Sequence, residues 1–302
     1  MTNYAGYMGK VIRLDLGSRS VSEYPWTDRD RQLYLGGKAM ASKIMYDNFT
    51  GSEKPLEPEN IIVISTGPLT GTGAPSSSRF NISTLSPQTG ITTSSNCGGN
   101  FGHYLKKAGY DALIIAGKCE KLTWVEIHND IIKFHDAEEL KGLCTTPTQE
   151  SIQQKLDEER GCEVKCGKVV IGPAGENLVK YASVFSNERA AGRAGVGCVF
   201  GSKNLKGIAV SGTHEVSIYD LQKTHKLFEK WVETLKKHPL TGNQLPKMGT
   251  AGLVTTMQMR GLLPTRNYAK GQFEDFELVN GETFAEDINI VNKGCLSCCL
   301  LY

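Results

Sequence analysis

Three segments of this sequence recur in the same order further along the chain. "VISTGPLTG" is matched by "VVIGPAGEN", "NCGGNFGHYLK" by "RAGVGCVFGSKNLK", and "GYDALIIAG" by "KGIAVSG". The spacings are 105, 99 and 95 residues, measured from Gly67 to Gly172, from Gly102 to Gly201, and from Gly117 to Gly212. A drift of this kind is what loop insertions produce in a duplicated unit. The recurrence predicts that residues 1–212 contain two copies of one fold, with chance similarity of short glycine-rich segments as the alternative.

The same region alternates short strand-like runs with helical ones. "KVIRLDL" followed by "VSEY", and "LTWVEIHNDIIKFH" with Asn129 and Asp130 at its centre, have the alternating pattern of hairpins. "NIIVISTGPL" is typical of a buried strand. "LGGKAMASKIMYDNF" has helical spacing, and a further helix is expected to begin near Pro147 with Thr146 as its cap.

The pattern changes after "GIAVSG". Residues 218–238 place Leu221, Phe228, Trp231 and Leu235 on one face of a long amphipathic helix. We therefore expect a first domain over residues 1–212 and a mainly helical second part over residues 213–302.

Composition excludes several classes of function. The formal net charge of +2 creates no field that would attract nucleic acid or a membrane surface. No apolar run approaches the roughly 18 residues of a membrane helix, and no signal peptide opens the chain, so a cytoplasmic location is expected. The P-loop, the dinucleotide fingerprint and the nucleophile elbow are absent, and the six histidines show no metal-ligand spacing. A nucleotide-binding enzyme is therefore disfavoured, and no catalytic residue is assigned.

One segment has the composition of a ligand-binding region. In residues 67–102, 20 of 36 positions are Gly, Ser or Thr, interrupted by apolar residues at strand-like intervals. Glycines allow the backbone to approach a ligand, and the Arg79 guanidinium can bind an anion. An anionic, polar cofactor is predicted here. Lys106 and Lys107, just beyond, are expected on a solvated helix face.

These segments, with "IGPAGENLVKYAS" and "LPKMGTAGLV", resemble the aldehyde ferredoxin oxidoreductase family along essentially the whole chain, as the N-terminal half of a family member. The resemblance implies an α+β fold of two duplicated antiparallel sheet units with interspersed helices, followed by a short, mainly helical segment. It implies a tungsten (or molybdenum) bis-pyranopterin, a 4Fe–4S cluster, and Mg²⁺ bridging the pterin phosphates.

The resemblance also assigns roles to residues. The backbone carbonyls of Asn96 and Ala190, one from each repeat, are expected to bind Mg²⁺, and Arg79 to lie between the cluster and a pterin. The remaining expected cofactor-loop residues are Gly98, Gly99, Arg189, Gly192 and Arg193.

The last eight residues contain three cysteines. The family motif C-x₂-C-x₃-C supplies three thiolates to a cubane cluster. Cys295 and Cys298 match its first two positions, Tyr302 occupies the third, and Cys299 is an imperfect substitute. We expect a chain cut short within this motif.

The implied activity is oxidation of a small-molecule aldehyde to a carboxylate, with ferredoxin as electron acceptor. Because the downstream cluster, pterin and substrate residues of the family are missing, the chain is not expected to be active alone. The alternative is a non-catalytic remnant that folds but binds cofactor weakly or not at all. A homodimer is left open.

Overall fold

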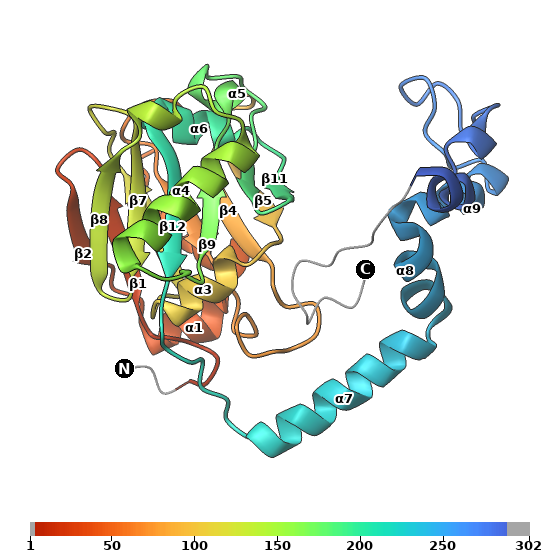
Figure 1. Cartoon of the computed structure of the whole chain (residues 1–302), viewed down its shortest axis with the longest axis horizontal. Coiled ribbons are helices and arrows are strands. Elements are labelled where there is room, and N and C mark those ends of the chain that lie inside the picture. The colour runs from red at the N-terminus through yellow and green to blue at the C-terminus, as the bar shows by residue number, and fades with distance from the viewer. Residues whose placement is uncertain (1–3, 289–302) are drawn as a thin grey trace. The chain divides into compact units, whose positions relative to one another are not determined.

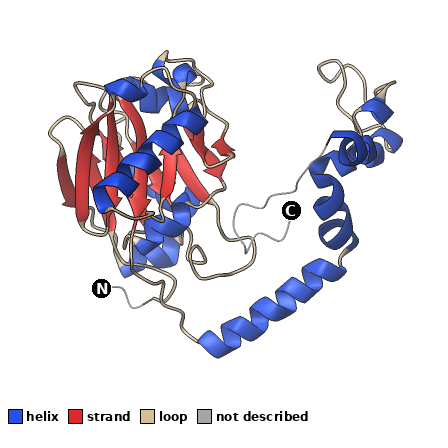
Figure 2. Ribbon diagram, in the orientation of Figure 1, coloured by secondary structure: helices blue, strands red, loops and turns tan. Residues whose placement is uncertain are grey.

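The structure, a computed structural model, describes residues 4–288. These residues divide into two compact units, with the boundary between Tyr219 and Asp220. The first unit holds the twelve strands of the described chain in two sheets of six strands each (Figure 2).

The first sheet and its helices come from the first repeat. The elements are β1 (Val11–Asp15), β2 (Ser20–Glu23), α1 (Asp28–Tyr34), α2 (Gly37–Asn48), β3 (Ile62–Ser65), β4 (Phe80–Leu85), β5 (Thr92–Cys97), α3 (Phe101–Lys107) and β6 (Ala112–Ala116).

The second sheet comes from the second repeat. The elements are β7 (Thr123–His128), β8 (Ile131–Asp136), α4 (Thr145–Arg160), β9 (Gly167–Val170), α5 (Pro173–Glu176), β10 (Val184–Ser186), β11 (Arg189–Ala191), α6 (Val196–Ser202) and β12 (Leu205–Ser211).

The strand orders confirm the predicted duplication. They are β2-β1-β6-β3-β4-β5 and, read from the matching end, β8-β7-β12-β9-β10-β11, so every strand has a counterpart six places later. The hairpins β1–β2 and β7–β8, whose sequences show little likeness, are also counterparts. Each sheet is antiparallel except for one parallel pair, β1 with β6 and β7 with β12. The predicted fold class is therefore confirmed, with mixed sheets as the refinement.

One predicted correspondence is wrong. Gly102 is the second residue of α3, whereas Gly201 is the sixth residue of α6, and Gly197 is the second. Gly102 packs on Phe80 at the start of β4, and Gly197 on Ser183 just before β10. Gly197 is therefore the structural counterpart of Gly102.

The two sheets pack face to face over a shared core. Alternate residues of each central strand point inward, such as Leu113 and Ile115 of β6 and Ile208 and Val210 of β12. The outer faces are also apolar because α2 covers the first sheet and α4 covers the second, where Figure 1 shows α4 crossing the strands. Covering both faces explains near-continuous apolar strands such as "ALIIA".

The short helices α3 and α6 join the two repeats. α3 packs on β9 and β12 of the second sheet, and α6 packs on β4 of the first sheet as well as on β12. This position explains why the expectation for Lys106 is wrong: its side chain is fully buried, and Lys107 is partly buried. The start of α4 also differs slightly from the prediction: the helix begins at Thr145, Cys144 occupies the N-cap position without a side-chain capping hydrogen bond, and Pro147 is the third helical residue.

Lys203 is a second buried lysine, 1% exposed. Its Nζ donates hydrogen bonds to the carbonyl oxygens of Gly117 at 2.9 Å and Pro58 at 3.1 Å. Within residues 4–288 no carboxylate lies close enough to form an ion pair with it. Burial lowers its pKa from 10.5 to about 8, while Glu59 and Asp15 act in the opposite direction.

This pKa predicts a pH-dependent stability. Because the unfolded chain binds the Lys203 proton more tightly than the folded chain, the free energy of unfolding should rise with pH between about 8 and 10.5. Lys203→Met should remove a contribution that changes by up to about 3 kcal/mol over this range. Urea unfolding of both proteins at pH 7, 9 and 10 measures it, and a difference between them that does not vary with pH would contradict the assignment.

The second unit is built from helices. They are α7 (Leu221–Lys237), α8 (Leu245–Met248), α9 (Leu253–Met259) and α10 (Gly281–Thr283), joined by short 3₁₀ and π turns. Asp220 caps α7 by accepting the Lys223 N–H. The predicted amphipathic helix and the mainly helical second part are confirmed.

Candidate functional site

The two repeats meet along equivalent edge strands. β5 is the last strand of the first sheet and β11 the last of the second, and the two are in contact. Asn96 lies in β5 and Ala190 in β11. The two residues expected to offer carbonyl oxygens to Mg²⁺ therefore occupy adjoining strands that correspond in the two repeats.

Hydrogen bonds between the repeats connect the loops around these strands. The backbone N–H of Arg193 donates to Ser95 Oγ at 3.1 Å, and the N–H of Asn100 donates to Asn187 Oδ1 at 3.2 Å. We call residues 95–100 and 186–193 the twin-loop junction. It contains all the expected cofactor-loop residues except Arg79.

Arg79 lies beside this junction. It directly precedes Phe80, which pairs with Cys97 across β4 and β5. Arg79 and Arg193 are exposed, and Arg189 is partly buried. All three arginines therefore lie in or directly beside the junction, and the guanidinium group is a side chain that binds anions well.

The expected backbone sites differ in exposure. Asn96, Ala190 and Gly192 are exposed, whereas Gly98 and Gly99 are buried. The exposed strand edge leaves backbone groups accessible to a ligand, while Gly99 lies at the contact between the repeats.

Gly99 occupies a position that no other residue fits. Its φ is +87°, and a Cβ atom there would lie 2.7 Å from Ser186 Oγ and 2.8 Å from the Ser186 carbonyl oxygen. Ser186 Oγ and Asn100 Oδ1 are buried and have no hydrogen-bond partner in the described part of the chain. Unpaired buried polar atoms are costly, so this junction has spare hydrogen-bonding capacity for a polar ligand.

The expected cluster ligands Cys295 and Cys298 lie outside the described residues, as do Cys299 and Tyr302.

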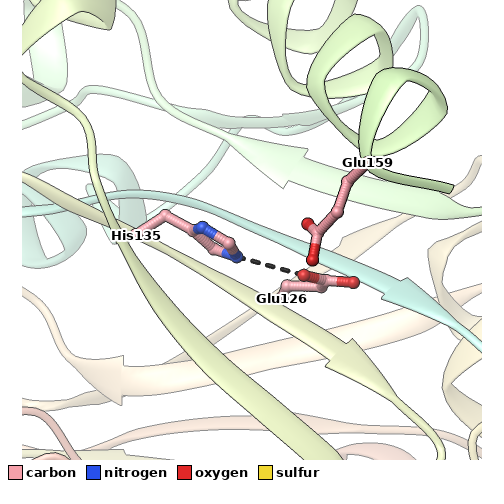
Figure 3. A group of neighbouring side chains, drawn as sticks. All are labelled: Glu126, His135 and Glu159. Carbon is pink, nitrogen blue, oxygen red and sulfur yellow. Dashed lines mark hydrogen bonds and ion pairs between the residues drawn. The ribbon is translucent and has the colours of Figure 1, made fainter.

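A second polar cluster was not predicted from the sequence. Figure 3 shows Glu126 of β7, His135 of β8 and Glu159 of α4 pointing toward one another, with one potential ligand atom from each within 4.8 Å of the others. His135 Nε2 lies 3.0 Å from Glu126 Oε2, and Arg160 donates to Glu126 Oε1 at 2.7 Å. Lys133 pairs with Glu159.

This cluster is an ion-pair network. The hydrogen bond from His135 lowers the pKa of the Glu126 carboxyl, with Arg160 acting the same way against the effect of burial. Both oxygens of Glu126 already have cationic or donor partners, so the carboxylate has little to offer a metal. The cluster ties α4 to the β7–β8 hairpin, at the opposite edge of the second sheet from β11. The only sign of this cluster in the sequence was the alternating pattern of the β7–β8 hairpin, because Glu159 and Arg160 lie far from the hairpin along the chain.

In residues 4–288, no helix has both the length and the apolar character needed to cross a bilayer.

Known proteins are similar to this chain in sequence and fold. Residues 11–212 match the family described as aldehyde ferredoxin oxidoreductase, N-terminal domain, and residues 226–301 match domains 2 and 3 of the same enzyme. Tungsten-containing aldehyde ferredoxin oxidoreductases of Thermococcus kodakarensis and Pyrococcus furiosus are each 39% identical over 97% of this chain and 48% of their own length. The chain thus spans about half the length of the curated relatives it matches.

A solved structure is also similar. The active-site complex of benzoyl coenzyme A reductase with 1,5-dienoyl-CoA aligns over 80% of this chain and 36% of its own, with a TM-score of 0.74 and 35% identity.

Proposed function

This chain belongs to the aldehyde ferredoxin oxidoreductase family, and on that premise we propose that it forms the cofactor-seating part of a tungsten-pterin oxidoreductase. The observation that carries the proposal is the twin-loop junction, where corresponding strands of two repeats meet at an exposed edge. A pair of similar organic ligands around one metal has the same two-fold character as this surface.

The residues of the junction suit such a group. The carbonyl oxygens of Asn96 and Ala190 would hold Mg²⁺ between two phosphates, since Mg²⁺ prefers oxygen ligands and relieves their repulsion. The exposed Gly192 would allow the backbone to approach this group closely, whereas Gly98 and Gly99 are buried and Gly99 instead lets the two loops pack together.

The arginines supply the charge balance. Arg79, Arg189 and Arg193 would neutralise the phosphates and orient the ring systems through hydrogen bonds. When bound, the metal-pterin group supplies two-electron redox chemistry, and a 4Fe–4S cluster passes the electrons on singly. We propose Cys295 and Cys298 as thiolate ligands of that cluster.

The proposed reaction is oxidation of an aldehyde to a carboxylate, with ferredoxin as acceptor, in the cytoplasm. The aldehyde substrate is proposed from the names of the curated relatives. The likeness to a benzoyl coenzyme A reductase favours a second candidate, reduction of an aromatic thioester. The junction would contact the cofactor rather than the substrate, and this chain is not proposed to be active alone. Turnover of aldehydes against aromatic thioesters by a longer enzyme that contains this chain together with the missing family domains would distinguish the two.

Metal analysis tests the proposal. Chain purified without oxygen should carry tungsten or molybdenum together with Mg²⁺ and iron. Arg193→Glu should lower the tungsten and Mg²⁺ contents together, by about tenfold or more, because a charge-assisted bond to phosphate becomes a repulsion. Cys295→Ser should remove iron and leave Mg²⁺ in place, and Lys237→Glu, on exposed α7, serves as the control for charge reversal.

A metal-free wild-type chain would overturn the proposal and support the non-catalytic alternative. Equal metal loss in Arg193→Glu and Lys237→Glu would count against the junction as the site.

A further inference from the structure

We infer that Asn187, held in place by Gln149, is a positioning residue that keeps the two loops of the twin-loop junction in register. The inference rests on the proposed function, which requires ligand groups from both loops. Nothing in the recurring motifs pointed to either residue.

Asn187 links the repeats through its side chain. It lies in the turn between β10 and β11, with a left-handed backbone at φ +54°. Its Oδ1 accepts the N–H of Asn100, the residue that precedes α3 in the other repeat. The side chain therefore joins the loop that leads into Ala190 to the loop that follows Asn96.

Gln149 fixes the backbone of Asn187. Its side chain is 8% exposed and projects from α4. Gln149 Oε1 accepts the Asn187 N–H at 2.7 Å, and Nε2 donates to the Asn187 carbonyl at 3.2 Å and to Thr145 at 3.3 Å. A single amide thus holds both backbone polar groups of the turn residue, which sets the direction of its side chain.

The two loops pack closely against each other at Gly99. The space where Gly99 would carry a Cβ is filled by Ser186 and by Asn187 Oδ1, at 3.1 Å. Asn100 makes a second bond to the other repeat: its Nδ2 donates to the carbonyl of Cys166 at 3.1 Å. The loop of the first repeat is therefore held both by the β10–β11 turn and by the residue that precedes β9.

This register matters for the cation. Mg²⁺ requires near-octahedral geometry at about 2.1 Å from its oxygen ligands. Carbonyl groups on two separate chain segments satisfy that only if the segments hold a constant separation. We therefore assign Asn187 the task of setting the distance between the Asn96 and Ala190 carbonyls.

Two substitutions of Asn187 separate positioning from folding. Asn187→Gly keeps the left-handed backbone accessible and removes the acceptor, while Asn187→Asp keeps an acceptor oxygen. Asn129→Gly is the matched control: Asn129 also has a positive φ, +51°, and its Oδ1 also accepts a backbone N–H, that of Thr213 at 3.1 Å. It lies in the β7–β8 turn, at the other edge of the second sheet.

The readouts are Mg²⁺ and tungsten content, amide exchange and melting temperature. In Asn187→Gly we expect Mg²⁺ content to fall about fivefold or more and exchange at Asn100 to quicken about tenfold, as for loss of one hydrogen bond. Asn187→Asp should restore both. Asn129→Gly should leave both unchanged, with a melting temperature similar to that of Asn187→Gly.

Unchanged exchange at Asn100 in Asn187→Gly would overturn the inference, as would equal Mg²⁺ loss in Asn129→Gly. If the wild-type chain holds no Mg²⁺ or tungsten, the proposed function fails, and the exchange comparison alone decides whether Asn187 couples the loops.

Discussion

Gly201→Ala is expected to unfold the first unit or to leave it barely stable, with a loss of about 3 kcal/mol or more. Gly201 lies in α6, whose seven residues are all buried. A Cβ atom there would lie 1.9 Å from the carbonyl oxygen of Gly175 in α5. The added Cβ would clash with backbone atoms of Gly175, so no change of side-chain rotamer can relieve the clash. Loss of soluble protein, or a lowered urea midpoint, measures the effect.

Gly67→Ala is the matched control. Gly67 has no positive φ, and the nearest atom to its missing Cβ is Thr70 Oγ1 at 4.0 Å. Alanine there should change the free energy of unfolding by less than about 1 kcal/mol. Similar losses for both variants would show that the contact between α5 and α6 is not the cause.

Lys106→Met is expected to cost about 3–5 kcal/mol, because it leaves a buried carboxylate without its cation. Lys106 Nζ lies 2.5 Å from Asp111 Oδ1, and both side chains are almost completely buried. Lys106 also donates to the carbonyl of Gly6 at 2.9 Å. Burial lowers the pKa of Lys106, and the attraction of Asp111 opposes that effect. Equilibrium urea unfolding at pH 7 gives the change.

A second substitution tests the mechanism. Asp111 accepts the N–H groups of Met8 and Gly9 in addition to its ion pair. Asp111→Asn added to Lys106→Met keeps an acceptor and removes the stranded charge, so part of the lost stability should return. The exposed pair of Lys10 and Asp130 supplies the control, since Lys10→Met should cost under about 1 kcal/mol. A double variant as unstable as Lys106→Met would refute the stranded-charge explanation.

The sequence predicted the architecture well because duplication repeats whole elements. Matches at three places were enough to imply two copies of one fold, and the family resemblance implied that each copy is a sheet, although the similarity of the β1–β2 and β7–β8 hairpins was not visible. The parallel pairing of β1 with β6 could not be predicted from alternation, which shows strands but not their partners. Local patterns also misplaced Lys106, since its burial arises from α3 packing on the second sheet.

The candidate site was predicted only in part. The resemblance brought Asn96 and Ala190 to attention, and the structure adds that their strands adjoin. The hydrogen bond from Asn100 to Asn187 joins residues 87 positions apart in the sequence, and the hydrogen bond between Asn187 and Gln149 joins residues 38 positions apart. Neither leaves a periodic or compositional signal. The Glu126 network was missed for the same reason.

The packing of α3 and α6 on strands of the other repeat has a consequence for how the first unit unfolds. Each repeat buries part of the apolar surface of the other, so neither repeat has a complete hydrophobic core of its own. Unfolding of one repeat would expose core residues of the other. The 219-residue unit should therefore unfold in a single cooperative step. If the two repeats were expressed separately, each would expose apolar surface, and each should fold only on association with the other.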